Sequence, residues 1–229
     1  TVDRFAEMIT ANLATIEARK ENLQQVVDSL RFQVDKVRVY GNDYQPELEG
    51  DNVEVYTGPD YTDNAKFFWL PISKGIYLSC DDDIIYPPDY VETIVKGLKK
   101  YPNTWVTFHG RRLKGLNLPY YSGHDSYPCL RTVPHDYEIH VAGTGVSAFH
   151  TDTIKFDPLT WKEYKMADIM ASLELAKKGV RVICLAHKIF WLKITESSKN
   201  QSIFISERRN SKRQDELANV IYELVSRNK

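Results

Sequence analysis

Leu78-Ser79-Cys80-Asp81-Asp82-Asp83-Ile84-Ile85-Tyr86-Pro87-Pro88 is the stretch that most narrows the fold of this chain. The apolar run 76–80 predicts a buried strand, and three consecutive carboxylates follow where that strand ends. The two prolines predict the start of a helix, whose apolar side carries Val91, Ile94, Val95 and Leu98. A strand, an acidic turn and a helix in this order indicate an α/β fold, in which ligands collect at the carboxyl ends of strands.

The alternation of strand and helix patterns continues on both sides of this stretch. Apolar or alternating runs predict strands at 9–16, 34–40, 53–56, 105–108, 146–149 and 180–185. Helical spacing predicts helices at 19–30 and 166–178, the second ended by Gly179. We therefore predict one α/β domain over residues 1–210, with a mixed, mostly parallel central sheet flanked by helices.

Two segments depart from this alternation. Residues 111–137 contain Gly, Pro, His and several Tyr without periodicity, which predicts a long surface loop that acts as an ordered lid or a substrate-facing insertion. Within the C-terminal segment 211–229, residues 211–227 predict an amphipathic helix. This helix would pack on the body of the domain or dock to a partner or a further domain.

The composition is that of a soluble globular protein. In 229 residues, 30 Lys and Arg oppose 31 Asp and Glu, a formal net charge of −1 that disfavours nucleic acid as a partner. No run approaches the roughly 20 apolar residues of a membrane span, and no basic segment followed by an apolar run opens the chain. Cys80, Cys129 and Cys184 form no CxxC pair, so we expect a reducing, cytoplasmic location without a disulfide framework.

The three adjacent carboxylates of the acidic turn, Asp81, Asp82 and Asp83, require a compensating cation because their charges repel one another. Oxygen-rich sites suit Mg²⁺ or Mn²⁺, which take one or two protein carboxylates and complete their shell with phosphate oxygens and water. A metal diphosphate is therefore the predicted ligand. The alternative is a solvated acidic turn whose charge favours the start of the following helix.

The run Asp81 to Glu92, DDDIIYPPDYVE, together with Gly143-Thr144-Gly145 and residues 182–192, resembles nucleotide-sugar-dependent glycosyltransferases of the GT-A fold. The resemblance is strongest to bacterial capsule enzymes that add N-acetylglucosamine to heparosan-type polysaccharide, and it spans most of residues 8–192. It implies a Rossmann-like GT-A domain that uses Mn²⁺ or Mg²⁺. Such an enzyme would transfer N-acetylglucosamine or another hexosamine from a UDP-sugar to an oligosaccharide or polysaccharide acceptor. The resemblance is weak in 111–137 and beyond Lys193, the segments that bear on the acceptor.

The resemblance also implies roles for the residues of the acidic turn and of the glycine-containing loop. Asp83 would bind the metal that bridges the diphosphate, and Asp81 would lie near the ribose or the donor sugar. Asp82 would support both of these carboxylates in their roles. The loop of Gly143, Thr144 and Gly145 would bring backbone close to the sugar, since glycine has no side chain to obstruct it; its alternative is a turn that leads into a strand.

Four further residues match donor-binding positions of the family. Thr15 and Arg19 match first-loop positions that touch the nucleotide, and Asp43 follows the second predicted strand, where uracil or ribose is recognised. Lys66 matches a family lysine that offsets phosphate charge, although Ala65 stands where that motif has glycine. An exposed lysine is the alternative for Lys66.

Asp168 matches the acidic residue that opens the late helix of the family. In an inverting transferase it would take the proton of the acceptor hydroxyl; in a retaining one, which the capsule resemblance implies, it would orient the acceptor, and a helix-capping Asp is the third interpretation. His187 would complete the metal shell or touch a phosphate, or else be structural. His109 could line the cleft.

Two other classes of function stay open at this point. The first is a non-catalytic glycan-binding or scaffold domain, and the second is a Mg²⁺-dependent nucleotidyltransferase or phosphohydrolase. The chain lacks a GxxxxGK[ST] loop, which weakens the second class. The capsule resemblance adds a further glycosyltransferase domain or a membrane-associated assembly complex as partner. It also implies a peripheral place at the inner face of the membrane, with the basic stretch 208–213 as a surface contact or simply a solvated face.

Overall fold

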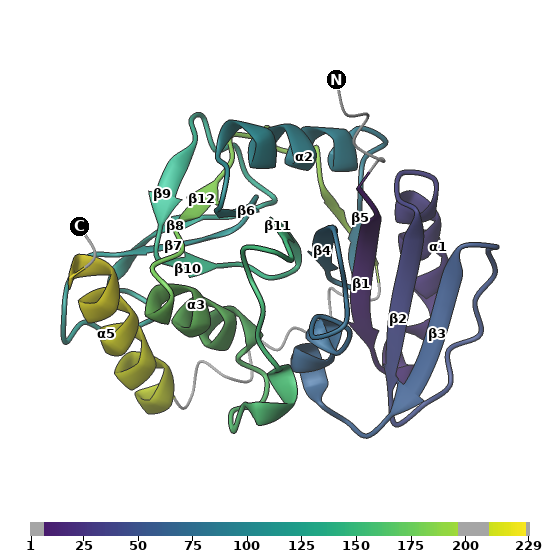
Figure 1. The fold of residues 1–229 in the computed structure, drawn as a ribbon, viewed down its shortest axis with the longest axis horizontal. Helices are drawn as coiled ribbons and strands as arrows, with labels where there is room; N and C mark the ends of the chain where they lie inside the picture. The colour runs from purple at the N-terminus through teal and green to yellow at the C-terminus, as the bar shows by residue number, and fades with distance from the viewer. Residues whose placement is uncertain (1–6, 197–210, 228–229) are drawn as a thin grey trace.

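An eight-stranded mixed sheet forms the centre of the protein, in the order β3-β2-β1-β4-β11-β6-β12-β9 (Figure 1). The computed structural model describes residues 7–196 and 211–227. The strands of this sheet are β1 (Ile9–Thr15), β2 (Lys36–Asn42), β3 (Val53–Gly58), β4 (Ile76–Cys80), β6 (Trp105–Thr107), β9 (Tyr137–Ile139), β11 (Val146–His150) and β12 (Val182–Cys184).

Strands β1 to β4 are all parallel, so their carboxyl ends lie at one edge of the sheet. In this register Thr15 of β1 is opposite Gly41 of β2, and Leu13 is opposite Cys80 of β4. Strand β11 is antiparallel to both β4 and β6, β12 is parallel to β6, and β9 is antiparallel to β12. The predicted mixed, mostly parallel sheet is confirmed.

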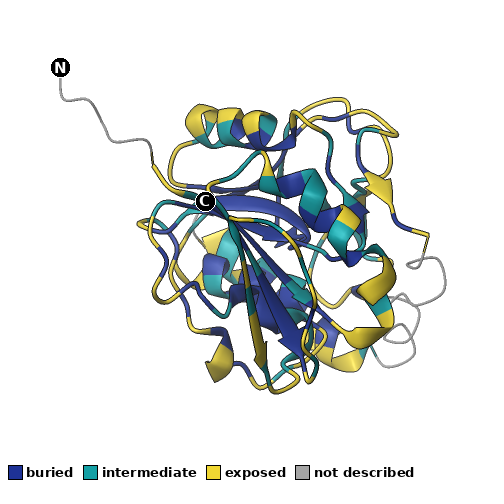
Figure 2. Ribbon diagram, turned by 90° about the vertical axis from the view of Figure 1, so that its right-hand side faces the viewer, coloured by how far each residue is buried: buried dark blue, intermediate teal, exposed yellow. Residues whose placement is uncertain are grey.

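Helices cover both faces of the sheet, because its strands carry apolar side chains on both faces. Helices α1 (Lys20–Arg31) and α2 (Tyr90–Lys100) pack on one face, where α1 buries residues at helical spacing: Leu23, Val26, Val27 and Leu30. Helices α3 (Ala167–Lys177) and α5 (Lys212–Arg227) pack on the other. Figure 2 shows the resulting buried interior in dark blue beneath exposed loops and outer helix faces.

Strand β4 illustrates how one strand serves both cores. Tyr77 points into the α3 face, where its ring stacks on Phe149 at 5.3 Å between centroids, while Phe149 stacks on Trp105 at 4.4 Å. Leu78, the next residue, belongs to the core under α1 and α2. This alternation is the period of two that a strand imposes on its side chains.

Helix α5 lies against α3 at the lower left of Figure 1. It buries Leu217, Ala218 and Ile221 in the same core as α3. Gly179 follows the C-cap of helix α3, and its φ of +66° is a left-handed conformation that glycine adopts at low cost. The amphipathic pattern of α5 is thus matched by a packing partner within the chain.

The prediction of one long loop over residues 111–137 is wrong. Strands β7 (Gly110–Leu113) and β8 (His124–Tyr127) pair with each other, and β7 also pairs with β10 (Val141–Ala142) in a separate three-stranded sheet. Strands β7 and β8 are short and mostly polar. An ion pair joins them, from Arg112 Nη2 to Asp125 Oδ2 at 3.1 Å, and such a contact leaves no apolar pattern in the sequence. Sequence periodicity could not indicate them because each strand places only one large apolar side chain, Leu113 or Tyr127, against the core.

The remaining regular elements are short. Strands β5 (Ile84–Ile85) and β13 (Lys193–Ile194) pair antiparallel, and three 3-10 helices occur: η1 (Glu17–Arg19), η2 (Thr62–Phe67) and η3 (Pro158–Thr160). Within residues 7–196 and 211–227, no helix has both the length and the apolar character needed to cross a bilayer.

Candidate active site

The acidic turn lies at the carboxyl end of β4, beside the end of β1. The guanidinium of Arg19, from η1 after β1, forms ion pairs with the carboxylates of Asp82 and Asp83, the second at 3.1 Å. The side chain of Asp82 is only 6% exposed, whereas that of Asp83 is 18% exposed. Asp83 is therefore the more accessible of the two to a ligand that arrives from solvent.

Burial dominates the acid–base behaviour of this pair of carboxyls. It raises the pKa of Asp82 to about 6, because the Arg19 charge offsets only part of the cost of ionisation and Asp83 adds repulsion. Burial also opposes ionisation of Arg19, but Asp82 and Asp83 outweigh it and raise the pKa of the guanidinium. Arg19 thus supplies the counter-charge that Asp82 and Asp83 require.

The shifted pKa of Asp82 predicts a pH-dependent stability. A carboxyl whose pKa rises from 3.8 to about 6 on folding binds more protons in the folded state between these values, so its contribution to stability falls as pH rises through that window. We expect Asp82→Asn to become more stable relative to the parent by up to about 3 kcal/mol between pH 4 and pH 7. Urea unfolding of both metal-free proteins across this range tests it. A stability difference that does not change with pH would contradict it.

Lys66 provides a second, deeper cation. It lies on η2, is 4% exposed, and its ammonium forms an ion pair with the Asp81 carboxylate. Burial opposes ionisation of Asp81, but Lys66 holds the pKa of that carboxyl below its ordinary value. The exposed alternative for Lys66 is wrong: η2 packs against β1, which buries the lysine stem.

Asp63, three residues before Lys66, shares its side of η2 because a 3-10 helix has three residues per turn. Burial raises the pKa of Asp63, although Lys66 acts against this. One carboxylate oxygen of Asp63 accepts a hydrogen bond of 3.1 Å from the backbone N–H of Ala167, at the start of α3. Asp63 thus connects Lys66 to the helix that carries Asp168.

The loop of Gly143, Thr144 and Gly145 connects the acidic turn to α3. The N–H of Asp81 donates to the carbonyl of Gly145 at 3.1 Å, and the hydroxyl of Tyr86 donates to the same carbonyl at 2.6 Å. On the other side, the N–H and hydroxyl of Thr144 donate to Oδ1 of Asp168 at 2.8 and 2.7 Å. The candidate base is therefore oriented by the same loop that holds the acidic turn.

Gly145 is required by close approach. A Cβ at this position would stand 1.9 Å from Oδ2 of Asp81. We expect Gly145→Ala to displace the Asp81 carboxylate from Lys66 and to lower the free energy of unfolding by about 1–3 kcal/mol. Gly115→Ala is the matched control, since its Cβ would meet only Leu118 Cδ1, at 3.7 Å. Equal thermal stability of the two variants would contradict the expectation.

The first two strands contribute Thr15 and Asp43. Thr15 is buried at the end of β1, beside Asp82. Asp43 is exposed just beyond β2 with a φ of +53°, and its N–H donates to Gly58. Between them Asn42 is buried and donates to the carbonyls of Thr15 and Thr62 at 3.2 and 3.1 Å, which fixes the strand ends around the edge.

The structure does not bring His187 to the carboxylates. Its ring nitrogens face the backbone carbonyls of Leu185 at 2.9 Å and Pro128 at 3.2 Å, so a metal ligand role would require one of these contacts to break. His109 lies nearer the site: burial and Arg111 lower its pKa, and its Nδ1 accepts from the N–H of Cys129 at 3.2 Å.

The carboxylates of the acidic turn can hold a divalent metal only if the phosphate oxygens of a bound diphosphate supply further ligands. Among the residues that the structure describes, no three His, Cys, Asp or Glu side chains are grouped so as to hold an ion by themselves. One or two carboxylates, from Asp83 with Asp82 behind it, are nevertheless the usual protein share of a Mg²⁺ or Mn²⁺ site that is completed by phosphate oxygens and water. A metal that arrives with a diphosphate fits these residues.

Asp63, Tyr86 and Asn42 were not predicted from sequence. Tyr86 lies inside the DDDIIYPPDYVE motif, so the motif itself contained a signal for it. Asp63 stands one 3-10 turn before Lys66, but nothing in the sequence marks that segment as 3-10 helical. Asn42 precedes Asp43 directly and could have been found as a polar residue at the end of an apolar strand.

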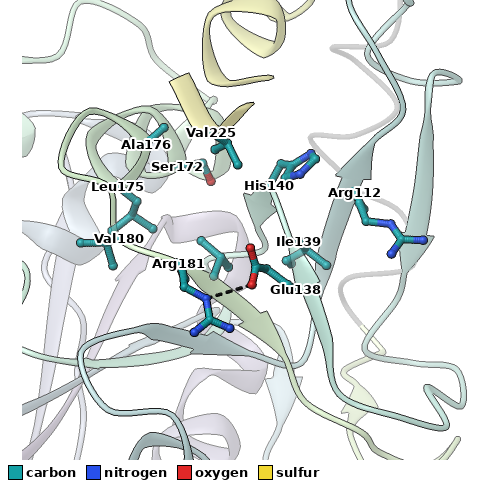
Figure 3. A pocket seen from close by; sticks show the side chains of 12 residues that line it. Arg112, Glu138, Ile139, His140, Ser172, Leu175, Ala176, Val180, Arg181 and Val225 are labelled. Atoms are coloured by element: carbon teal, nitrogen blue, oxygen red, sulfur yellow. Dashed lines mark hydrogen bonds and ion pairs between the residues drawn. The ribbon is translucent and has the colours of Figure 1, made fainter. Parts of the chain in front are cut away.

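A cavity of about 560 Å³ lies elsewhere, between β9, β12, α3 and the end of α5 (Figure 3). Apolar side chains such as Ile139, Leu175 and Val225 line it, and two of its charged residues, Glu138 and Arg181, pair with each other at 2.9 Å. None of the predicted site residues lines this cavity. We therefore place the candidate site at the carboxyl edge of the sheet, because the charged side chains of the acidic turn, and not the size of a cavity, identify it.

Comparison with known proteins shows the fold. No described protein family and no curated protein matches the chain. Among solved structures, the chain is similar to the crystal structure of GalNAc-T7 with UDP, GalNAc and Mn²⁺, at 10% identity and a TM-score of 0.55. The match covers 82% of this chain and 45% of that protein, so the chain spans less than half the length of its structural neighbour. The predicted α/β fold of the GT-A, Rossmann-like type is confirmed. The comparison does not support the capsule specificity that the sequence resemblance implied.

Proposed function

We propose that this protein is a metal-dependent glycosyltransferase that transfers a sugar from a UDP-sugar to a glycan acceptor. One observation carries the proposal: the acidic turn, Lys66 and the Thr144–Asp168 pair meet at the carboxyl edge of a GT-A sheet. These groups come from segments far apart in the sequence. The structural neighbour was crystallised with UDP, GalNAc and Mn²⁺, which supports a nucleotide-sugar donor and a divalent metal.

The donor diphosphate would bind between the acidic turn and η2. Asp83, which is more accessible than Asp82, would hold Mn²⁺ or Mg²⁺, which when bound neutralises charge on the leaving diphosphate. Lys66 keeps Asp81 ionised and in place. Arg19, which pairs with Asp82 and Asp83, would be free to bind a phosphate if these carboxylates held a metal.

Asp168 would act on the acceptor. Its Oδ1 accepts two hydrogen bonds from Thr144, which fixes the carboxylate at the start of α3. In an inverting reaction this carboxylate would take the proton from the attacking hydroxyl, and in a retaining reaction it would orient that hydroxyl. Thr15, Asp43, Gly143 and Gly145 complete the proposed donor site, and His187 belongs to it only if one of its carbonyl contacts opens.

The finer assignment follows from the sequence resemblance. N-acetylglucosamine or another hexosamine is the proposed sugar, and an oligosaccharide or polysaccharide of the capsule type is the proposed acceptor. We place the enzyme in the cytoplasm, peripheral to the inner face of the membrane, with another glycosyltransferase domain or an assembly complex as partner. Residues 208–210 of the basic stretch 208–213 lie outside the described residues.

Isothermal titration with UDP, GDP and CMP, each with and without Mn²⁺, tests the donor site. We expect Mn²⁺-dependent binding of UDP alone. Binding of no nucleotide would overturn the donor assignment and favour the scaffold alternative. A second measurement separates an enzyme from a binding domain: release of UDP from UDP-N-acetylhexosamines in the presence of glycan acceptors.

A further inference from the structure

Two neighbouring loops beside the acidic turn expose apolar side chains. Val133 and His187 form an antiparallel bridge in which each N–H donates to the other's carbonyl at 2.9 Å. The N–H of Ile189 donates to the hydroxyl of Thr132 at 3.1 Å. These bonds hold residues 130–132 alongside residues 188–190, and we call the exposed side chains of both, with those of the adjoining β13, the loop patch.

The loop patch carries four large apolar side chains that face solvent. Phe190 is 76% exposed, Ile189 46%, Ile194 42% and Leu130 37%. Strand β13, which carries Ile194, is the exposed arrow drawn in yellow on the right of Figure 2. Adjacent exposed apolar side chains of this size mark an interaction surface more often than single ones do.

The turn that presents Phe190 is held in a conformation unfavourable for phenylalanine. The N–H of Trp191 approaches the carbonyl of Lys188 at 3.4 Å, which closes a four-residue turn, and Phe190 takes its third position with a φ of +66°. Glycine usually occupies such a position. Trp191 anchors the turn through its indole N–H, which donates to Asp89 at 2.9 Å, and through its ring, 4.7 Å from that of Phe108. The fold therefore keeps an aromatic side chain exposed where a smaller residue would be less strained.

Basic side chains surround these apolar ones. Arg131, Lys188 and Lys193 are exposed, and within the described part of the chain none of the three forms an ion pair. Lysines elsewhere on the surface do pair, for example Lys100 with Asp136. Glu196 is the one acidic residue in 188–196, so the basic side chains of the loop patch outnumber the acidic one beside them.

We propose that the loop patch docks the protein on an anionic lipid bilayer. Aliphatic and aromatic side chains at the tip of a surface enter the interface between headgroups and acyl chains, and the surrounding Lys and Arg bind the anionic headgroups. An anionic glycan would also attract the basic residues, but the aliphatic Leu130, Ile189 and Ile194 favour hydrocarbon, since sugars stack on aromatic rings. The N–H of Thr195 donates to the carbonyl of Asp83 at 2.8 Å, so docking would place the candidate site next to the membrane surface.

This inference rests on the proposed peripheral location of the enzyme, and its test has no readout in common with nucleotide binding. The full chain is sedimented with vesicles of phosphatidylcholine, alone or mixed with phosphatidylglycerol. We expect binding to the mixed vesicles only. Phe190→Gly removes the side chain and relieves the backbone strain of the turn, and it should weaken binding to the mixed vesicles roughly tenfold. Arg131→Glu combined with Lys188→Glu should weaken it by at least about 30-fold.

Matched controls come from other faces of the molecule. Phe32 is 77% exposed just after α1, and Lys74 and Lys99 are exposed and form no ion pair with any residue of 7–196 or 211–227. Phe32→Ala and the Lys74→Glu, Lys99→Glu pair should bind vesicles like the parent. Unchanged thermal stability of each variant shows that it is folded. Failure of the parent to bind mixed vesicles, equal loss in the controls, or sedimentation only with an anionic polysaccharide would overturn the proposal, whatever the titration with UDP gives.

Discussion

Asp83→Asn is expected to abolish the Mn²⁺-dependent binding of UDP and to lower sugar transfer by a factor on the order of 10³. The substitution keeps the shape of the side chain but removes a charge that a divalent metal needs from this turn. It should not unfold the protein, because Asp83 is the less buried partner of Arg19 and its loss relieves repulsion on Asp82. Titration calorimetry with UDP and Mn²⁺, followed by a transfer assay, measures both effects.

Asp51→Asn serves as the matched control, because Asp51 is an exposed carboxylate in the loop before β3. It should leave UDP binding and transfer at the level of the parent. If Asp83→Asn still binds UDP in a Mn²⁺-dependent way, the metal does not depend on Asp83 and the donor site must be placed elsewhere. If it binds UDP normally but fails to transfer, Asp83 acts on the sugar and not on the diphosphate.

Lys66→Met is expected to lower the free energy of unfolding by about 3–5 kcal/mol. Methionine fills a similar volume but leaves Asp81 without its ion-pair partner and the half-buried Asp63 without its compensating charge. The cost comes from these uncompensated carboxylates more than from the loss of the ion pair itself. Urea unfolding at neutral pH measures it.

The double variant Lys66→Met, Asp81→Asn separates that cause from a packing defect. Removal of both charges should recover part of the lost stability, because one uncompensated carboxylate is gone. Lys99→Met, on the exposed side of α2, should change stability by less than about 0.5 kcal/mol. A cost for Lys66→Met no larger than that of Lys99→Met, or no recovery in the double variant, would show that Lys66 does not neutralise these carboxylates.

The sequence alone determined seven of the eight strands of the central sheet, all but β9, and the place of its acidic turn. The sequence predicts strand β4 with its observed bounds, Ile76–Cys80, helices α1 and α3 within two residues of their observed ends, and the start of α2 within two residues of Tyr90. These features depend on residues a few positions apart, whose apolar spacing fixes which face is buried. The turn follows, since parallel strands in an α/β sheet place their carboxyl ends at one edge.

Only the tertiary structure decided which groups meet at that edge. Arg19 reaches Asp82 across 63 residues, Thr144 holds Asp168 across 24, and Asp63 caps α3 across 104. It also placed His187 against backbone carbonyls and built a three-stranded sheet where a loop was predicted. Such contacts depend on how distant segments pack, and a local pattern of apolar and polar residues does not specify the partner that neutralises a buried charge or pairs with a short polar strand.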